Sequence, residues 1–239
     1  MEIIPAREFN ALYIYLDSLW LIALFFFLLF KKRYIALIAG VAGGLIYFLV
    51  DYGIFYLLLN TRTVTGMDTA LLLLWLSISY GFTNFAWIWL WLDRDGNALE
   101  WSLLIISGWF ATALLSKSFG SNFAIISIQR GTSSYHGAMA LILLIGYMIL
   151  ILKNIKLSKT ADKKINILWI LSIGILVQFS WEAVLLVTGI RNPGVMPLIV
   201  NSLLETNMGL PFLFLMHRAV NIRFEENLQR KIIKTAGKY

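Results

Sequence analysis

Four acidic residues stand inside long apolar stretches of this chain. They are Asp17, Asp51, Glu182 and Glu205. An ionisable group at the centre of a membrane helix costs about 2.5–3.5 kcal/mol on insertion scales, so acids in such places face protein or water rather than lipid. Buried carboxyl groups of this kind couple transport to protons or donate a proton in catalysis. The four acids are therefore predicted to line a shared binding cavity.

Amide side chains accompany two of these acids. Gln178 lies four residues before Glu182, and Asn201 lies four residues before Glu205. Residues four apart share one face of a helix, so each amide is expected beside an acid. The rest of the predicted ligand-contacting set is Tyr80 and Asn84, four apart in another apolar run, with Arg130, His136 and Arg191 near the ends of runs.

The elements that position these residues are predicted to be membrane helices. Hydrophobic residues make up 59% of the chain, charged residues 14%, and the mean hydropathy is +0.77. Continuously apolar runs of about 20 residues can cross about 30 Å of hydrocarbon only as helices. We therefore expect an all-α, polytopic integral membrane protein with seven transmembrane helices in residues 1–216. The expected spans are residues 11–30, 34–59, 69–92, 99–115, 135–152, 165–190 and 196–216.

The basic residues predict the orientation of the chain. With the N-terminus outside, 15 Lys and Arg residues fall in cytoplasmic segments and 5 fall outside. This bias favours an N-terminus outside and a cytoplasmic C-terminus, in the plasma membrane of a bacterium or archaeon. Residues 217–239 are then a basic cytoplasmic tail. Its apolar residues recur every four positions, which suits an amphipathic helix on the inner leaflet, and a solvated basic tail is an equal alternative.

In this orientation all four acids lie in the outer half of the bilayer. They are about 7–10 residues from the outer ends of their spans, or roughly 10–15 Å. No Lys, Arg or His lies deep in an expected span, so we expect these carboxyl groups to be unpaired and proton-labile. The outer bases Arg62, Arg130 and Arg191 are expected either to contact a ligand or to anchor lipid headgroups. The outer loop, residues 116–134, contains the apolar segment 123–128 and is a candidate lid.

Two parts of the chain carry loosely matching features. Asp51, Arg62 and the segment YGFTNF follow one another in the first half, and Glu182, Arg191 and LLETNMG do so in the second. A parallel repeat of three spans, a linking span and three spans is one arrangement compatible with this match.

Several chemistries are disfavoured by the sequence. The chain has no cysteine, and its two histidines, His136 and His217, fall near opposite faces of the membrane, so no metal site is expected. There is no glycine-rich phosphate loop, and no cofactor is expected. The net charge of +7 is spread over loops and tail, which indicates contact with the bilayer rather than nucleic acid.

Two classes of function remain. In the first, which is preferred because small seven-span proteins are more often of this class, the protein binds or transports a small or amphipathic solute, with the carboxyl groups coupling its movement to protons. In the second, it is an intramembrane enzyme in which Asp51, Glu182 or Glu205 is the general acid on a lipidic or isoprenoid substrate. The chain length, the seven expected spans and the paired intramembrane acids resemble the integral-membrane terpene cyclases in architecture and residue type. That resemblance implies stabilisation of a cation by the many aromatic rings.

Overall fold

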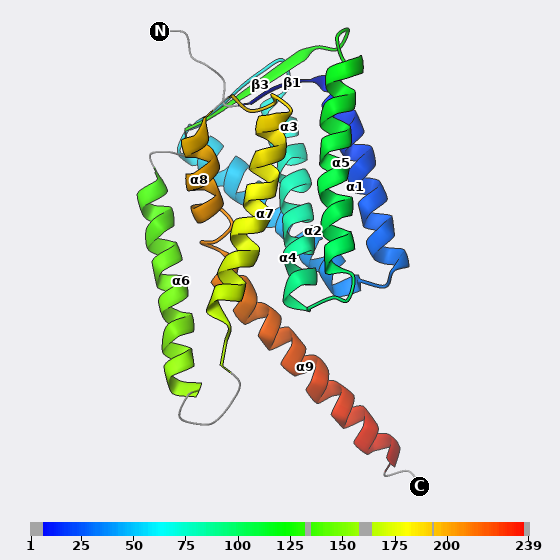
Figure 1. Cartoon of the computed structure of the whole chain (residues 1–239), viewed down its shortest axis with the longest axis vertical. Coiled ribbons are helices and arrows are strands. Elements are labelled where there is room, and N and C mark those ends of the chain that lie inside the picture. Colours follow the sequence, from blue (N-terminus) through cyan, green and yellow to red (C-terminus); the bar gives the residue numbers. More distant parts are fainter. Residues whose placement is uncertain (1–6, 132–134, 158–163, 193, 237–239) are drawn as a thin grey trace.

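The computed structural model describes residues 7–131, 135–157, 164–192 and 194–236. Most of these residues are helical, and a small sheet lies across one end of the helix bundle (Figure 1). Within the described residues, six helical stretches are long and apolar enough to cross a membrane. The predicted architecture of a helical, multi-pass membrane protein is therefore confirmed. The six stretches are Ala11–Phe30, Tyr34–Leu58, Thr69–Leu92, Ala98–Phe119, His136–Leu157 and Ile167–Val187.

Two of these stretches contain π-helical segments. The first consists of α2 (Tyr34–Phe48) and η1 (Leu49–Leu58), and the second of α3 (Thr69–Ser77), η2 (Ile78–Phe82) and α4 (Thr83–Leu92). π-Helical turns occur frequently at functional sites. The remaining helices are α1 (Ala11–Phe30), α5 (Ala98–Phe119), α6 (His136–Leu157), α7 (Ile167–Val187), α8 (Val195–Leu204) and α9 (Leu210–Ala236).

The stretch α3–η2–α4 is the centre of the bundle. Of the 18 residues in its most apolar segment, 72% are buried inside the protein, compared with 17% for the corresponding segment of α6. It approaches α2 backbone to backbone, because a Cβ atom on Gly81 would lie 2.7 Å from the carbonyl oxygen of Gly43 and 2.8 Å from the Cα of Gly44. Small residues on α2 therefore allow the close packing that membrane helices favour.

The expected seventh span is divided into two helices. α8 ends at Leu204, and α9 begins at Leu210. Pro211 lies in the first turn of α9, where the missing N–H has no helical partner to lose. The break leaves Glu205 at the end of a helix instead of inside one. The predicted boundary between the bundle and the tail, after Met216, falls within the continuous helix α9.

The sheet consists of three short antiparallel strands. They are β1 (Arg7–Asn10), β2 (Arg62–Thr65) and β3 (Ile125–Arg130), in the order β1-β3-β2. The segment expected to be a lid is thus largely the central strand, β3. Its residues Ile126 and Ile128 are buried. Arg62 lies opposite Arg130 across the strands. Each strand therefore carries an arginine to this end of the bundle.

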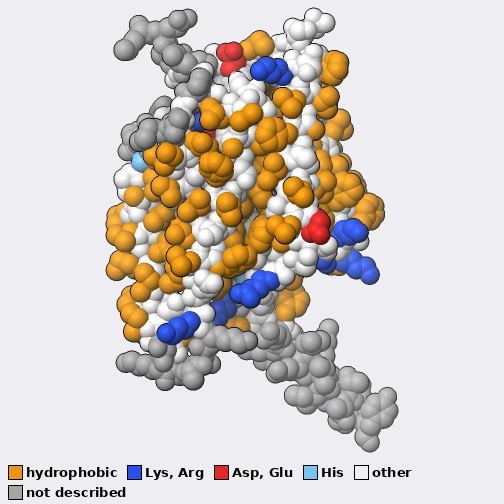
Figure 2. Space-filling view, viewed as in Figure 1, with side chains coloured by type: hydrophobic (Ala, Val, Ile, Leu, Met, Phe, Trp, Pro, Cys, Tyr) orange, Lys and Arg blue, Asp and Glu red, His pale blue; other side chains and the backbone are white. Residues whose placement is uncertain are grey.

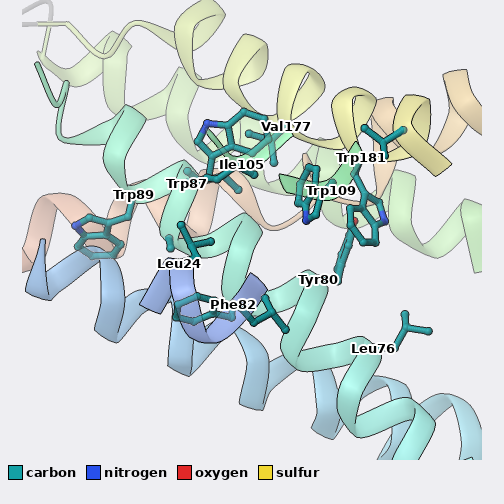
Figure 3. Close-up of a cluster of buried hydrophobic side chains, with 14 of the residues drawn as sticks. Leu24, Leu76, Tyr80, Phe82, Trp87, Trp89, Ile105, Trp109, Val177 and Trp181 are labelled. Atoms are coloured by element: carbon teal, nitrogen blue, oxygen red, sulfur yellow. The ribbon is translucent and has the colours of Figure 1, made fainter. Parts of the chain in front are cut away.

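Aromatic side chains fill the interior of the bundle. Figure 3 shows Trp87, Trp109 and Trp181 in this cluster; the ring centroids of Trp109 and Trp181 are 4.6 Å apart. At the end away from the sheet, His217 of α9 bonds to Asp93 at 2.6 Å and contacts the ring of Trp89. Hydrophobic side chains cover the flanks, and most of the basic side chains visible in Figure 2 lie at that same end.

Candidate functional site

Asp51 is ion-paired with two arginines. It projects from η1, and the guanidinium of Arg62 contacts its Oδ1 through Nε at 2.7 Å and through Nη2 at 2.5 Å. Nη2 of Arg130 lies 3.3 Å from each carboxylate oxygen. Asp51 and Arg62 are each 4% exposed. The pair is therefore removed from water, and β2 and β3 hold both arginines above the acid.

Glu182 has a second set of partners. Nη1 of Arg191 lies 2.9 Å from its Oε2, and Nη2 of Arg7 lies 3.8 Å from its Oε1. The amide of Asn201 donates to Oε1 at 3.1 Å. Asn201 was expected beside Glu205 from its spacing, but α8 packs along α7 and brings it to Glu182 instead.

The expectation that no base accompanies the buried acids is wrong for Asp51 and Glu182. Asp51 is paired with the arginine 11 residues later, and Glu182 with the arginine 9 residues later. Each arginine follows the helical stretch that carries its acid, and the chain turns back so that the guanidinium points into the bundle. We call Asp51, Glu182, Glu205, Arg7, Arg62, Arg130 and Arg191 the charged cluster.

Two members of the charged cluster, Arg7 and Arg62, are not in the predicted ligand-contacting set, although Arg62 is among the outer bases for which ligand contact or headgroup anchoring is expected. A signal was present, because few basic residues are expected in the outer segments of a membrane protein. Of the five bases that the charge count places outside, four belong to the charged cluster: Arg7, Arg62, Arg130 and Arg191. The strands that carry the first three are only four to six residues long, too short to be recognised among apolar runs.

The arginines of the strands keep their charge at neutral pH. Burial lowers the pKa of Arg7 and the pKa of Arg62 to about 10. For Arg130 burial acts in the same direction, but the charges of Asp51 and Glu205 outweigh it and raise the pKa above its ordinary value. With all groups ionised, four arginines and three acids give the charged cluster a net charge of 4 − 3 = +1.

Glu205 differs from the other two acids of the charged cluster. In the described part of the chain, no arginine nitrogen lies within 4.0 Å of its carboxyl group. Its contact is the amide of Gln178, which donates to Oε2 at 3.1 Å. The hydroxyls of Tyr80 and Thr206 donate to Oε1 of the Gln178 side-chain amide. These bonds orient the amide so that its NH2 group faces Glu205 and, at 3.4 Å, Glu182.

A cavity of about 210 Å³ adjoins Glu205. Its polar lining includes Asp51, Arg62, Arg130, Tyr80, Asn84, Glu205 and Thr206. The rest of the wall is apolar: Ile46, Val50, Phe55, Phe85, Ile88, Met139, Met208, Leu210 and Leu213, with the ring of Tyr47. Pockets of this kind, mostly apolar with a few convergent polar groups, are typical of small-molecule sites.

Asn84 is a cavity-lining side chain with both of its polar atoms unsatisfied in the described structure. It is 1% exposed, and within the described residues neither its amide nitrogen nor its oxygen has a hydrogen-bond partner. Asn207, which also follows a threonine in the second half of the chain, is satisfied: it donates to Ser202 and accepts from Tyr147. A buried amide without partners costs about 1–3 kcal/mol. Asn84 therefore has the bonding capacity that a ligand could use.

Two predicted residues are not brought to the cavity. Asp17 is fully buried near Trp75 and Ser79, and it does not line the cavity. His136 begins α6 and is partly exposed, outside the cavity lining. The structure does bring together Asp51, Tyr80, Asn84, Gln178, Glu182, Asn201, Glu205, Arg130 and Arg191, through the contacts and the lining described above.

Within the described residues, no group of three or more His, Asp or Glu side chains is arranged to hold a metal ion. Comparison with known protein families, with characterised proteins and with solved structures found no match to this chain. The function is therefore argued from the chemistry of the site.

Proposed function

We propose that the protein is an intramembrane enzyme that protonates a lipidic or isoprenoid substrate in the cavity, with Glu205 as the general acid. The observation that carries the proposal is the contrast among the acids at the cavity. Asp51 and Glu182 are each ion-paired with arginines, whereas no arginine nitrogen in the described residues lies within 4.0 Å of Glu205, which faces a mostly apolar space. A carboxyl in that position can give a proton to a bound molecule.

The proton balance of the proposed step is simple. The Glu205 carboxyl transfers its proton to a carbon–carbon double bond of the substrate, which leaves a carbocation and a Glu205 carboxylate. Loss of a proton from the cation to that carboxylate forms a new double bond and restores the acid. The product is an isomer of the substrate. Gln178 supports the carboxylate stage, because its amide donates to Glu205 Oε2.

Aromatic rings in the cavity wall suit a cationic intermediate. Tyr47 contacts Tyr80 at 4.9 Å and Phe85 at 5.9 Å between ring centroids, and all three line the cavity. Ring faces attract a cation by about 0.5–2 kcal/mol each, and more strongly where water is excluded. The net positive charge at the sheet end favours a substrate whose polar end carries an oxygen near Arg130.

In this proposal the sheet lies outside and α9 ends in the cytoplasm. α8 and the first part of α9 together form a seventh, broken span. Two matched acid–arginine pairs, Asp51 with Arg62 and Glu182 with Arg191, support the proposed parallel repeat. Both pairs then belong to equivalent places in the two halves.

Transport is the weaker reading of the same cavity. A transporter must open to both sides of the membrane, but at the end away from the sheet aromatic rings pack between the helices: Trp91 and Trp169 are 5.4 Å apart, and Trp89 and His217 are 5.0 Å apart.

The experiment uses the purified protein in liposomes that contain an isoprenoid alcohol such as farnesol. The proposal expects an isomer of unchanged mass from the wild-type protein and none from Glu205→Gln. Proton-linked uptake of a solute without conversion would overturn the enzyme and support transport.

A further inference from the structure

We infer that the substrate is a membrane-dissolved amphiphile with one polar end, and that it enters sideways from the lipid between η1 and α6. This inference rests on the proposed function, because it concerns how that cavity is filled. The substrate comes from the membrane leaflet at the sheet end of the bundle.

The wall of the cavity on this side is formed by η1 and α6. Val50 and Phe55 of η1 and Met139 of α6 line it. At its sheet end, the rings of Phe55 and Tyr135 meet edge to face, with centroids 5.7 Å apart. Separating these two rings would part the wall between η1 and the start of α6.

α6 is the helix best able to move. It has the smallest buried share among the six apolar stretches, 17%, and it packs mainly against α7, α8 and α9 rather than against η1. In Figure 1 it stands at the edge of the bundle. Loosely packed elements open at low free-energy cost, so a small displacement of α6 can admit a molecule.

Packed side chains lie at both ends of the bundle. At the sheet end, β3 lies over the bundle with Ile126 and Ile128 almost fully buried, and Arg62 is held on Asp51. A solute from the aqueous side would have to break this buried ion pair. At the other end lie the packed rings of Trp89 and His217. A lipid-dissolved molecule needs neither barrier to open.

The chain supports a clean cross-linking test, because it has no cysteine. In the double variant F55C/Y135C, a short, reducible bis-methanethiosulfonate linker would tie η1 to α6. Tritiated farnesol in liposomes is the probe, and its rate of binding is measured before linking, after linking and after reduction. We expect binding to slow at least about tenfold on linking and to recover on reduction.

A second ring pair provides the matched control. Tyr15 and Phe123 also meet edge to face at the sheet end, with centroids 6.3 Å apart, but they do not line the cavity. Linking Y15C/F123C should leave the rate unchanged. Should the linked pair at Phe55 fail to fold, Met139→Trp places a larger side chain in the same wall and should also slow binding. Met148→Trp is its control, because Met148 lies on the same helix, is 49% exposed and does not line the cavity.

The outcomes separate this inference from the proposed function. An unchanged rate after linking Phe55 to Tyr135, or a block by the Tyr15 control instead, overturns lateral entry and leaves the acid chemistry of Glu205 standing. A slowed rate with full conversion by Glu205→Gln supports lateral entry and overturns the proposed acid. Absence of farnesol binding to the unlinked wild-type protein overturns the inferred substrate class.

Discussion

Removing the charge of Asp51 should destabilise the protein more than removing the charge of Glu205. Asp51 is 4% exposed and neutralises Arg62, which makes two contacts with it, and Arg130, which makes two longer ones. Removing one partner of a buried ion pair costs about 3–5 kcal/mol, since the other charge stays buried. Asp51→Asn should therefore shift the folding equilibrium by about two to three orders of magnitude or more.

Glu205→Gln leaves no arginine without its partner, and Gln178 can still donate to the new amide oxygen. Its cost should be below about 1 kcal/mol. The assay is the free energy of unfolding, measured by denaturing detergent titration of the protein in mixed micelles. The exposed Glu100→Gln serves as a control for loss of one negative charge.

A double-mutant cycle tests the cause. The stability lost in Asp51→Asn is attributed to a buried arginine left without its carboxylate. Adding Arg62→Gln to that variant should then restore about half or more of the lost free energy of unfolding, because removing both charges of a buried pair is far less costly than removing one. Strictly additive losses, or an Asp51→Asn protein as stable as the wild type, would refute the buried ion pair.

Three further predictions concern other residues. Asn84→Leu should raise the free energy of unfolding by about 1–3 kcal/mol, because it removes an unsatisfied buried amide. The same substitution should weaken farnesol binding in liposomes. A less stable variant would contradict the unsatisfied amide. Gly81→Ala should cost about 1–3 kcal/mol, because its Cβ would strike the backbone of α2, whereas Gly53→Ala should be tolerated in the same titration; equal effects would argue against the close contact. A fluorescent protein fused after residue 239 should be bright, and alkaline phosphatase at the same place inactive, because the C-terminus is proposed to be cytoplasmic; the reverse pattern would overturn the orientation.

The helical part of the fold follows from the sequence. Long, continuous apolar runs leave the backbone no alternative to the helix in lipid, and six of the stretches have the predicted lengths within a few residues. The sheet could not be predicted in this way, because its strands are short and pair residues that are more than 50 positions apart.

The site was partly predictable. Four-residue spacing correctly joined Gln178 to Glu182, because both lie on one uninterrupted helix, α7. The same spacing failed for Asn201 and Glu205, because α8 ends between them. The ion pairs between the acids and the arginines were missed, because the sequence does not reveal that the chain folds these outer residues back over the bundle.

The most direct test of the account is the identity of the molecule that occupies the cavity. Glu205→Gln should trap substrate, so its structure in a lipid nanodisc, together with native mass spectrometry, would reveal it. The account predicts one apolar molecule along Ile88 and Leu213, with its reactive carbon–carbon double bond against residue 205 and its oxygen-bearing end toward Arg130. A cavity closed by its own side chains, or occupied by a highly charged, water-soluble solute, would contradict it.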